Sequence, residues 1–198
     1  MIMYWNVAQI GVAFLAIYII FDMIKNKHRN ILKRVVFYSF LIYIISVLHV
    51  TLGLISFSSK PMAHSIQWYL QLKPFYFLGD LVGLYNHNGL DWFFWNSIKL
   101  SFYNFILLFP LGVYLSLFHV KSMKKAVFFI FVVTLTIEVL QLLLSYGGFL
   151  MLHRKFNVDD LILNTAGGVI GYFTFELFKL VYKKNIKILS KKIITPPV

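Results

Sequence analysis

Carboxylate and amide side chains interrupt the apolar sequence at two places where they could do chemistry. Glu138 and Gln141 stand three residues apart in one run of Leu, Ile and Val, and Asp160 and Asn164 stand four apart in the next run. Residues three or four apart share one face of a helix. A carboxylate that is partly removed from water can act as a general base, or it can orient an arginine toward an anion. Both pairs therefore mark candidate sites for proton transfer or anion binding.

Arg154 lies in the short segment that joins these two apolar runs. Its guanidinium offers parallel N–H donors that match a phosphate or a carboxylate. Asn104 is about seven residues into an earlier apolar run, which gives it a depth similar to that of Glu138 if both runs cross a membrane. We therefore predict that Asn104, Arg154 and the two polar pairs converge as one group of ligand-binding residues.

Glycines continue the polar stripe of the last apolar run. Gly168 follows Asp160 and Asn164 at steps of four residues, and Gly167 and Gly171 form a GxxxG step beside it. Small residues at this spacing let two helices approach closely in a membrane. We predict that the three glycines form a helix-packing seam, along which the last two apolar runs could lie together.

The bulk composition indicates that these elements lie in a membrane. The chain has 198 residues, of which 60% are hydrophobic and 13% charged, whereas soluble domains are about 45–50% apolar and about 25% charged. A membrane-spanning helix needs about 20 mainly apolar residues. Five segments meet this requirement: residues 7–24, 35–57, 97–118, 126–145 and 160–182. We therefore predict an all-α, polytopic transmembrane helix bundle of about five spans.

The positions of Lys and Arg predict the orientation of these spans. Basic clusters follow the first, third and fifth spans, and few basic residues lie on the opposite side. Cytoplasmic loops carry such an excess, so we expect the N-terminus outside and the C-terminus in the cytoplasm. The net charge of +12 then arises from topology signals, and we predict no nucleic-acid partner.

This threading divides the chain into regions. Residues 1–57 form two N-terminal anchors, residues 58–96 an outer loop rich in aromatic residues, and residues 183–198 a basic cytoplasmic tail that anionic lipid would attract. Within the outer loop, residues 71–78 are compatible with an interfacial helix, a re-entrant turn or a plain loop. Membrane lipids are the partners that these regions predict.

The sequence contains no pattern of metal ligands. It has no cysteine, which excludes disulfides, thiolate zinc sites and cysteine nucleophiles. Its histidines are scattered and show no HExxH or comparable spacing. We predict neither a metal nor a cofactor.

Several motifs taken together resemble the signature of VanZ-like membrane proteins. They are Glu-x-x-Gln at residues 138–141, Arg154, Asp-Asp-x-x-x-Asn-x-x-Gly-Gly at residues 159–168, and Gly171 followed by Tyr172. Asn104, the Phe-Pro-Leu-Gly stretch at residues 109–112 and the Lys-Pro-Phe turn at residues 73–75 resemble earlier motifs of the family. The resemblance covers residues 73–182, with three spans, and leaves the first two spans outside.

One position departs from the family pattern. Asn157 stands where the family often has an acidic residue after its arginine. The amide adds no charge, but Asn157 or Asp159 can still cap the helix that follows.

The resemblance implies a multi-pass protein of the bacterial cytoplasmic membrane. VanZ-like proteins are known for low-level resistance to lipoglycopeptide antibiotics of the teicoplanin kind. The resemblance supplies neither the molecular mechanism nor the oligomeric state. It also leaves open whether anything is transported.

Three hypotheses follow for the polar residues. In the first, an outer-leaflet pocket binds an anionic, lipid-linked cell-wall intermediate or the lipoglycopeptide itself. In the second, the protein is a membrane-embedded lipid hydrolase or transferase that uses Glu138 or Asp160 as its general base. No nucleophile with an adjacent base is readable, which favours a non-enzymatic role and leaves the second hypothesis open. In the third, the polar residues only fasten helices together.

Overall fold

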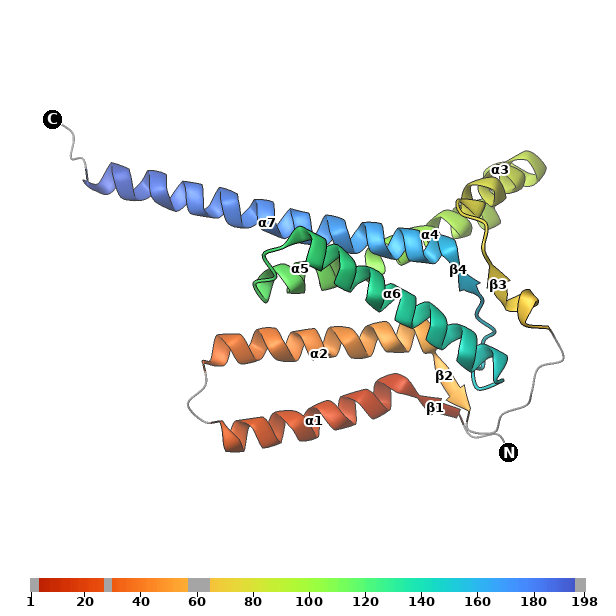
Figure 1. Cartoon of the computed structure of the whole chain (residues 1–198), viewed down its shortest axis with the longest axis horizontal. Coiled ribbons are helices and arrows are strands. Elements are labelled where there is room, and N and C mark those ends of the chain that lie inside the picture. The colour runs from red at the N-terminus through yellow and green to blue at the C-terminus, as the bar shows by residue number, and fades with distance from the viewer. Residues whose placement is uncertain (1–3, 27–29, 57–64, 195–198) are drawn as a thin grey trace. The chain divides into compact units, whose positions relative to one another are not determined.

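The structure, a computed structural model, describes residues 4–26, 30–56 and 65–194, and it is mainly helical (Figure 1). The helices are α1 (Val7–Lys25), α2 (Ile31–Leu52), α3 (Tyr76–Asn88), α4 (Trp92–Leu107), α5 (Phe109–Leu117), α6 (Met123–Tyr146), α7 (Val158–Ile194) and the short 3-10 helix η1 (Ile66–Tyr69). The strands are the very short β1 (Tyr4–Asn6), β2 (Leu54–Ser56), β3 (Leu70–Gln71) and β4 (Phe156–Asn157).

Among the described residues, five helical segments are long and apolar enough to cross a membrane. They are Val7–Lys25, Ile31–Leu52, Trp92–Leu117, Met123–Tyr146 and Val158–Ile186. The prediction of an all-α protein with about five spans is confirmed, and the boundaries differ from the predicted ones by a few residues. The outside position of the N-terminus stays a prediction.

The chain divides into two compact units. The first unit consists of Met1–Tyr76 and Leu135–Asp159, and the second of Phe77–Thr134 and Asp160–Val198. The boundaries fall at the start of α3, inside α6 and near the start of α7, so each of these helices contributes residues to both units.

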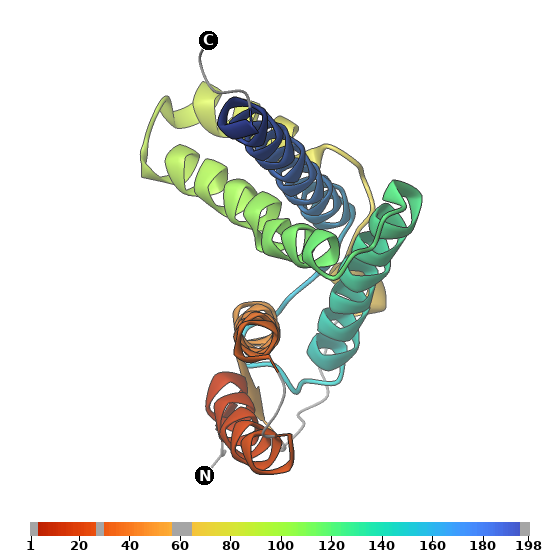
Figure 2. The same cartoon turned by 90° about the vertical axis from the view of Figure 1, so that its left-hand side faces the viewer.

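The first unit contains the α1–α2 hairpin, whose helices lie side by side in Figures 1 and 2. Gly11 permits this approach, because a Cβ there would lie 2.7 Å from the side chain of Ile45. At one end of the hairpin, β1 pairs antiparallel with β2, and Ile55 bridges to Leu150. The strands β3 and β4 form a short parallel pair in the same unit.

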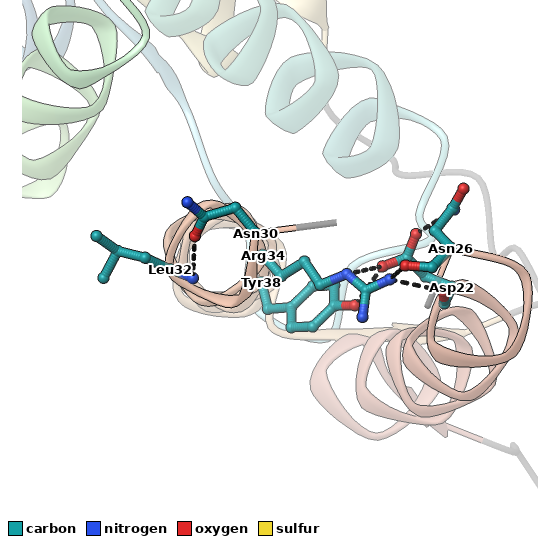
Figure 3. Close-up of polar contacts among 6 residues, drawn as sticks. All are labelled: Asp22, Asn26, Asn30, Leu32, Arg34 and Tyr38. Atoms are coloured by element: carbon teal, nitrogen blue, oxygen red, sulfur yellow. Dashed lines mark hydrogen bonds and ion pairs between the residues drawn. The ribbon is translucent and has the colours of Figure 1, made fainter. Parts of the chain in front are cut away.

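A polar clasp closes the other end of the hairpin (Figure 3). We use this name for Asp22, Asn26, Arg34 and Tyr38. The Asp22 carboxylate accepts hydrogen bonds from Asn26 Nδ2 at 2.7 Å and from Tyr38 Oη at 2.5 Å, and its Oδ2 lies 3.3 Å from Arg34 Nε. The Arg34 guanidinium also donates to the backbone oxygens of Asp22 and Asn26. Asp22 is buried, so the clasp compensates a carboxylate that sits out of water.

In the second unit, α7 packs against α4 and α5 through glycines (Figures 1 and 2). A Cβ at Gly167 would overlap the carbonyl oxygen of Phe105, and one at Gly171 would overlap that of Phe109. A Cβ at Gly112 of α5 would in turn overlap the carbonyl oxygen of Gly168. The backbones of α7 and of the third span therefore touch directly.

The third span is broken between α4 and α5. The break lies at Leu108, and Pro110 follows in the first turn of α5, where its missing N–H leaves no bond unmade. At the far end of α5, the Ser116 hydroxyl donates to Glu176 Oε1 at 2.7 Å. Lys179 Nζ donates to the same oxygen at 2.5 Å and to the Ser116 carbonyl at 3.2 Å.

The predicted outer loop, residues 58–96, contains more regular structure than the sequence indicated. Its described part holds η1, β3, α3 and the start of α4, while residues 57–64 lie outside the described residues. Residues 71–78 comprise the end of β3, a turn and the first turn of α3. In the region of the predicted tail, α7 continues to Ile194, and residues 195–198 lie outside the description.

Candidate functional site

Glu138 of α6 is a buried carboxylate that binds the backbone of the loop between α6 and α7. It is 1% exposed, and its Oε2 accepts a hydrogen bond from the backbone N–H of Asn157 at 3.0 Å. Asn157 is the last residue of β4, immediately before α7. A buried hydrogen bond is costly to leave unmade, so Glu138 holds the end of this loop.

Two further residues on the same face of α6 hold neighbouring backbone. Gln141 is buried, and its Nε2 donates to the carbonyl oxygen of Thr51 at 2.8 Å, near the end of α2. Ser145 is fully buried, and its Oγ accepts from the N–H of Arg154 at 2.9 Å. Their positions, three and seven residues after Glu138, place all three on one stripe. We call Glu138, Gln141 and Ser145 the bracing stripe.

The loop that the bracing stripe holds presents three basic residues to the surface. His153, Arg154 and Lys155 are all exposed. Lys155 Nζ lies 4.4 Å from the ring centroid of Trp68, a cation–π distance, and the His153 ring lies 6.5 Å from the same indole. We call these three residues and Trp68 the basic patch.

The guanidinium of Arg154 lies near a backbone oxygen rather than a carboxylate. Its Nη2 is 3.5 Å from the carbonyl oxygen of Val50, at the outer limit of a hydrogen bond. Across the part of the chain that the structure describes, Arg154 makes no ion pair. The predicted meeting of its guanidinium with Glu138 is therefore not observed, since only its backbone N–H meets the bracing stripe.

At the start of α7, Asn157 caps the helix and Asp159 binds the backbone of a turn. The Asn157 side chain accepts from the N–H of Asp159 at 3.0 Å, which is the capping bond that an Asn before a helix makes. Asp159, which is buried, accepts from the N–H of Phe75 at 2.5 Å. Phe75 has a φ of 59°, a conformation that a bulky residue adopts at a cost. The carboxylate of Asp159 thus stabilises a strained turn.

The remaining predicted residues pair within the second unit. Asn104 Nδ2 of α4 donates to Asp160 Oδ1 of α7 at 2.6 Å. Asn164 Nδ2, one turn further along α7, donates to Thr134 Oγ1 of α6 at 3.1 Å. Asn164 is 2% exposed, so its amide needs a partner in place of water. These two bonds tie α7 to the third and fourth spans.

A comparison of the sequence with models of known protein families shows to which family the chain belongs. The family model described as VanZ/LLP1 matches residues 36–179. The chain belongs to the VanZ-like family. The match begins within α2, so it takes in most of the second span, which the motifs had left outside. No curated protein and no solved structure matches the chain.

The VanZ-like motif residues thus fall into two sets. The first unit brings together Glu138, Gln141 and the backbone of Arg154, and the second brings together Asn104, Asp160 and Asn164. Convergence of all of them on one level stays a prediction. All three packing glycines meet the third span, and a Cβ at Gly168 would also lie 2.6 Å from Ile130 of the fourth.

Some residues that matter in this VanZ-like protein were not singled out from the sequence. Ser145 could have been found, because it continues the Glu138–Gln141 face at a helical step. Trp68 and Ser116 carried no local signal, since their partners lie far away in the chain. In the described ranges, no group of three or more His, Asp or Glu side chains could hold a metal ion.

Proposed function

We propose that this VanZ-like membrane protein lowers susceptibility to lipoglycopeptides of the teicoplanin kind by binding an anionic, lipid-attached group at the outer face of the bacterial cytoplasmic membrane. The observation that carries this proposal is the basic patch, in which exposed cations are held by buried polar residues. Exposed loops are usually mobile, and a surface cation in contact with water needs no buried hydrogen bonds to hold its loop in place. Such bracing is expected where a charge must be positioned for a ligand.

The chemistry of the patch points to a phosphate or a carboxylate. Arg154 offers a planar fork of donors, and Lys155 and His153 lie beside it in the chain. Lys155 is already oriented over the Trp68 ring, at 4.4 Å. A lipid-linked cell-wall intermediate carries phosphate, and a lipoglycopeptide carries carboxylate together with an acyl chain. Both would present their anion at the membrane surface, where the patch would lie with the N-terminus outside.

The bracing stripe would hold the loop of the basic patch in position and would not itself contact the ligand. Glu138 is 1% exposed, and one of its oxygens already accepts from a backbone N–H. A carboxylate so enclosed is poorly placed to take a proton from a substrate. This favours binding over the hydrolase or transferase alternative in its Glu138 form, while Asp160, whose Oδ1 accepts from Asn104, stays the other candidate base.

The proposal is tested by antibiotic susceptibility. The protein is expressed in a susceptible Gram-positive host, and the inhibitory concentrations of teicoplanin and of a glycopeptide without a lipid tail are measured. Arg154→Ala should abolish the increase in teicoplanin tolerance, and Arg154→Lys should restore part of it. Lys124→Ala removes an exposed cation at the start of α6 and serves as the matched control. Membrane abundance of each variant is followed through a C-terminal tag. Full tolerance in Arg154→Ala would refute the proposal.

A binding measurement separates the two anion sources. The protein in lipid nanodiscs is titrated with a fluorescent teicoplanin derivative and, separately, with a polyprenyl phosphate. A charge-assisted hydrogen bond contributes about 1.5–3 kcal/mol, so Arg154→Ala should weaken the true ligand roughly tenfold or more. Equal affinity of the native chain and Arg154→Ala for both probes would contradict the proposed site.

A further inference from the structure

The helix α3 has two different faces. It is 13 residues long, and Leu78, Val82 and Tyr85 recur at helical steps with exposures of 50%, 60% and 55%. The side opposite this row is formed by polar and small residues: Asp80, Gly83 and His87. An amphipathic helix with an uncovered apolar side needs an apolar surface to lie against.

The protein itself covers only part of this apolar side. Phe77, Leu81 and Leu84 form an adjoining row and are half-buried. No residue of α3 is fully buried. The row formed by Leu78, Val82 and Tyr85 is therefore the part of the apolar side that remains open.

The open row continues into aromatic residues at the start of a membrane span. Trp92, Phe93 and Trp95 are 69%, 58% and 57% exposed, and they lie in the first turn of α4, the first part of the third span. Trp at the end of a span marks the headgroup level of the bilayer. The Tyr85 ring lies 6.1 Å from that of Phe94 in the same turn, so α3 and the start of α4 share this level.

Hydrogen-bonded turns bound α3 on both sides. Before it, the N–H of Phe75 is held by Asp159. After it, Gly89 adopts a φ of 67° and closes the last turn by donating to the Tyr85 carbonyl at 2.8 Å. Residues 89–91 then separate α3 from α4. A residue of positive φ, Phe75 before the helix and Gly89 after it, thus bounds α3 at each end.

We propose that α3 lies in the headgroup layer of the leaflet in which α4 begins, with Leu78, Val82 and Tyr85 turned toward the acyl chains. The partner of this surface is the lipid itself. The helix contains Asp80 and His87 but neither Lys nor Arg, so apolar insertion rather than attraction to anionic lipid holds it there. This inference is independent of the function proposed for Arg154.

Single-cysteine spin labelling tests the proposal directly, because the chain has no native cysteine. Leu78→Cys and Val82→Cys probe the open row, and Asp80→Cys and His87→Cys are matched controls on the polar side of the same helix. The labelled full chains are reconstituted in phosphatidylcholine vesicles, and label accessibility to oxygen and to a water-soluble nickel complex is measured. We expect oxygen to dominate at 78 and 82, and nickel to dominate at 80 and 87.

Other outcomes would overturn the proposal. Nickel accessibility at all four positions would place α3 in water, and oxygen dominance at all four would make it a re-entrant helix. Strong dipolar coupling between Val82→Cys labels on two chains would identify a second copy as the partner. Added phosphatidylglycerol should leave the label depth unchanged, and a depth that increases with it would contradict apolar insertion.

Discussion

The polar clasp of the α1–α2 hairpin predicts a measurable coupling between Asp22 and Arg34. Asp22→Asn removes the negative charge but keeps the shape of the side chain. The side chains of Arg34 and Asp22 are 12% and 5% exposed in the native protein, so the variant leaves a guanidinium largely out of water without its counter-charge. Breaking a buried pair in this way costs about 3–5 kcal/mol.

Features of the clasp place the expected cost at the low end of that range. Arg34 also donates to two backbone oxygens, which would partly solvate its charge in the variant. The amide of Asn at position 22 could still accept from Tyr38. We therefore expect a loss of about 3 kcal/mol, which corresponds to roughly 6–12 °C in Tm for a chain of this size.

The assay is thermal unfolding of the detergent-solubilised protein, followed by size-exclusion fluorescence of a fused tag. Asp22→Leu with Arg34→Met replaces the pair by apolar residues, which is often neutral at buried positions. This double variant should therefore be more stable than Asp22→Leu or Arg34→Met alone. Strict additivity of the two single changes, or a Tm shift below about 1 °C for Asp22→Asn, would refute the reasoning.

Two further predictions concern α7 and the bracing stripe. Gly167→Ala adds a Cβ that overlaps the Phe105 carbonyl, so we expect the protein to lose about 1–3 kcal/mol of stability as α7 is pushed away from α4. The control, Gly79→Ala on α3, places a Cβ where nothing lies within 4 Å and should leave Tm unchanged or slightly raised. Equal Tm values for the two variants would contradict direct backbone packing. Ser145→Ala removes the acceptor for the Arg154 N–H, which should cost about 1 kcal/mol of stability. The variant should also lower teicoplanin tolerance at unchanged membrane abundance. Native tolerance would show that the Ser145 bond does not contribute to the function.

The sequence predicted the elements of this fold better than their partners. Hydropathy alone located the five spans, because a continuous apolar run of about 20 residues has few other interpretations. The strands β3 and β4 are two residues long, which is too short for any alternating pattern to appear. The helix α3 was only partly anticipated, since the sequence argument stopped at residue 78.

The candidate site shows the same limit. Glu138 and Gln141 were found because polar side chains are costly in an apolar run, but their partners are backbone groups of Asn157 and Thr51, which carry no sequence signal. Asn104 and Asp160 were expected at one depth, and the structure joins them. GxxxG identifies a small-residue face and leaves its partner helix unspecified, so the contact of Gly167 with Phe105 required the structure.

The bond between Phe75 and Asp159 has a consequence for biosynthesis. The two residues are 84 positions apart in the chain. At about 5–20 residues per second, a ribosome needs roughly 4–17 s to reach Asp159 after it has made Phe75. During that interval the turn before α3 lacks its acceptor, and β3 lacks the strand that pairs with it. A chain that ends before residue 156 would contain β3 without the strand that pairs with it and Phe75 without its acceptor.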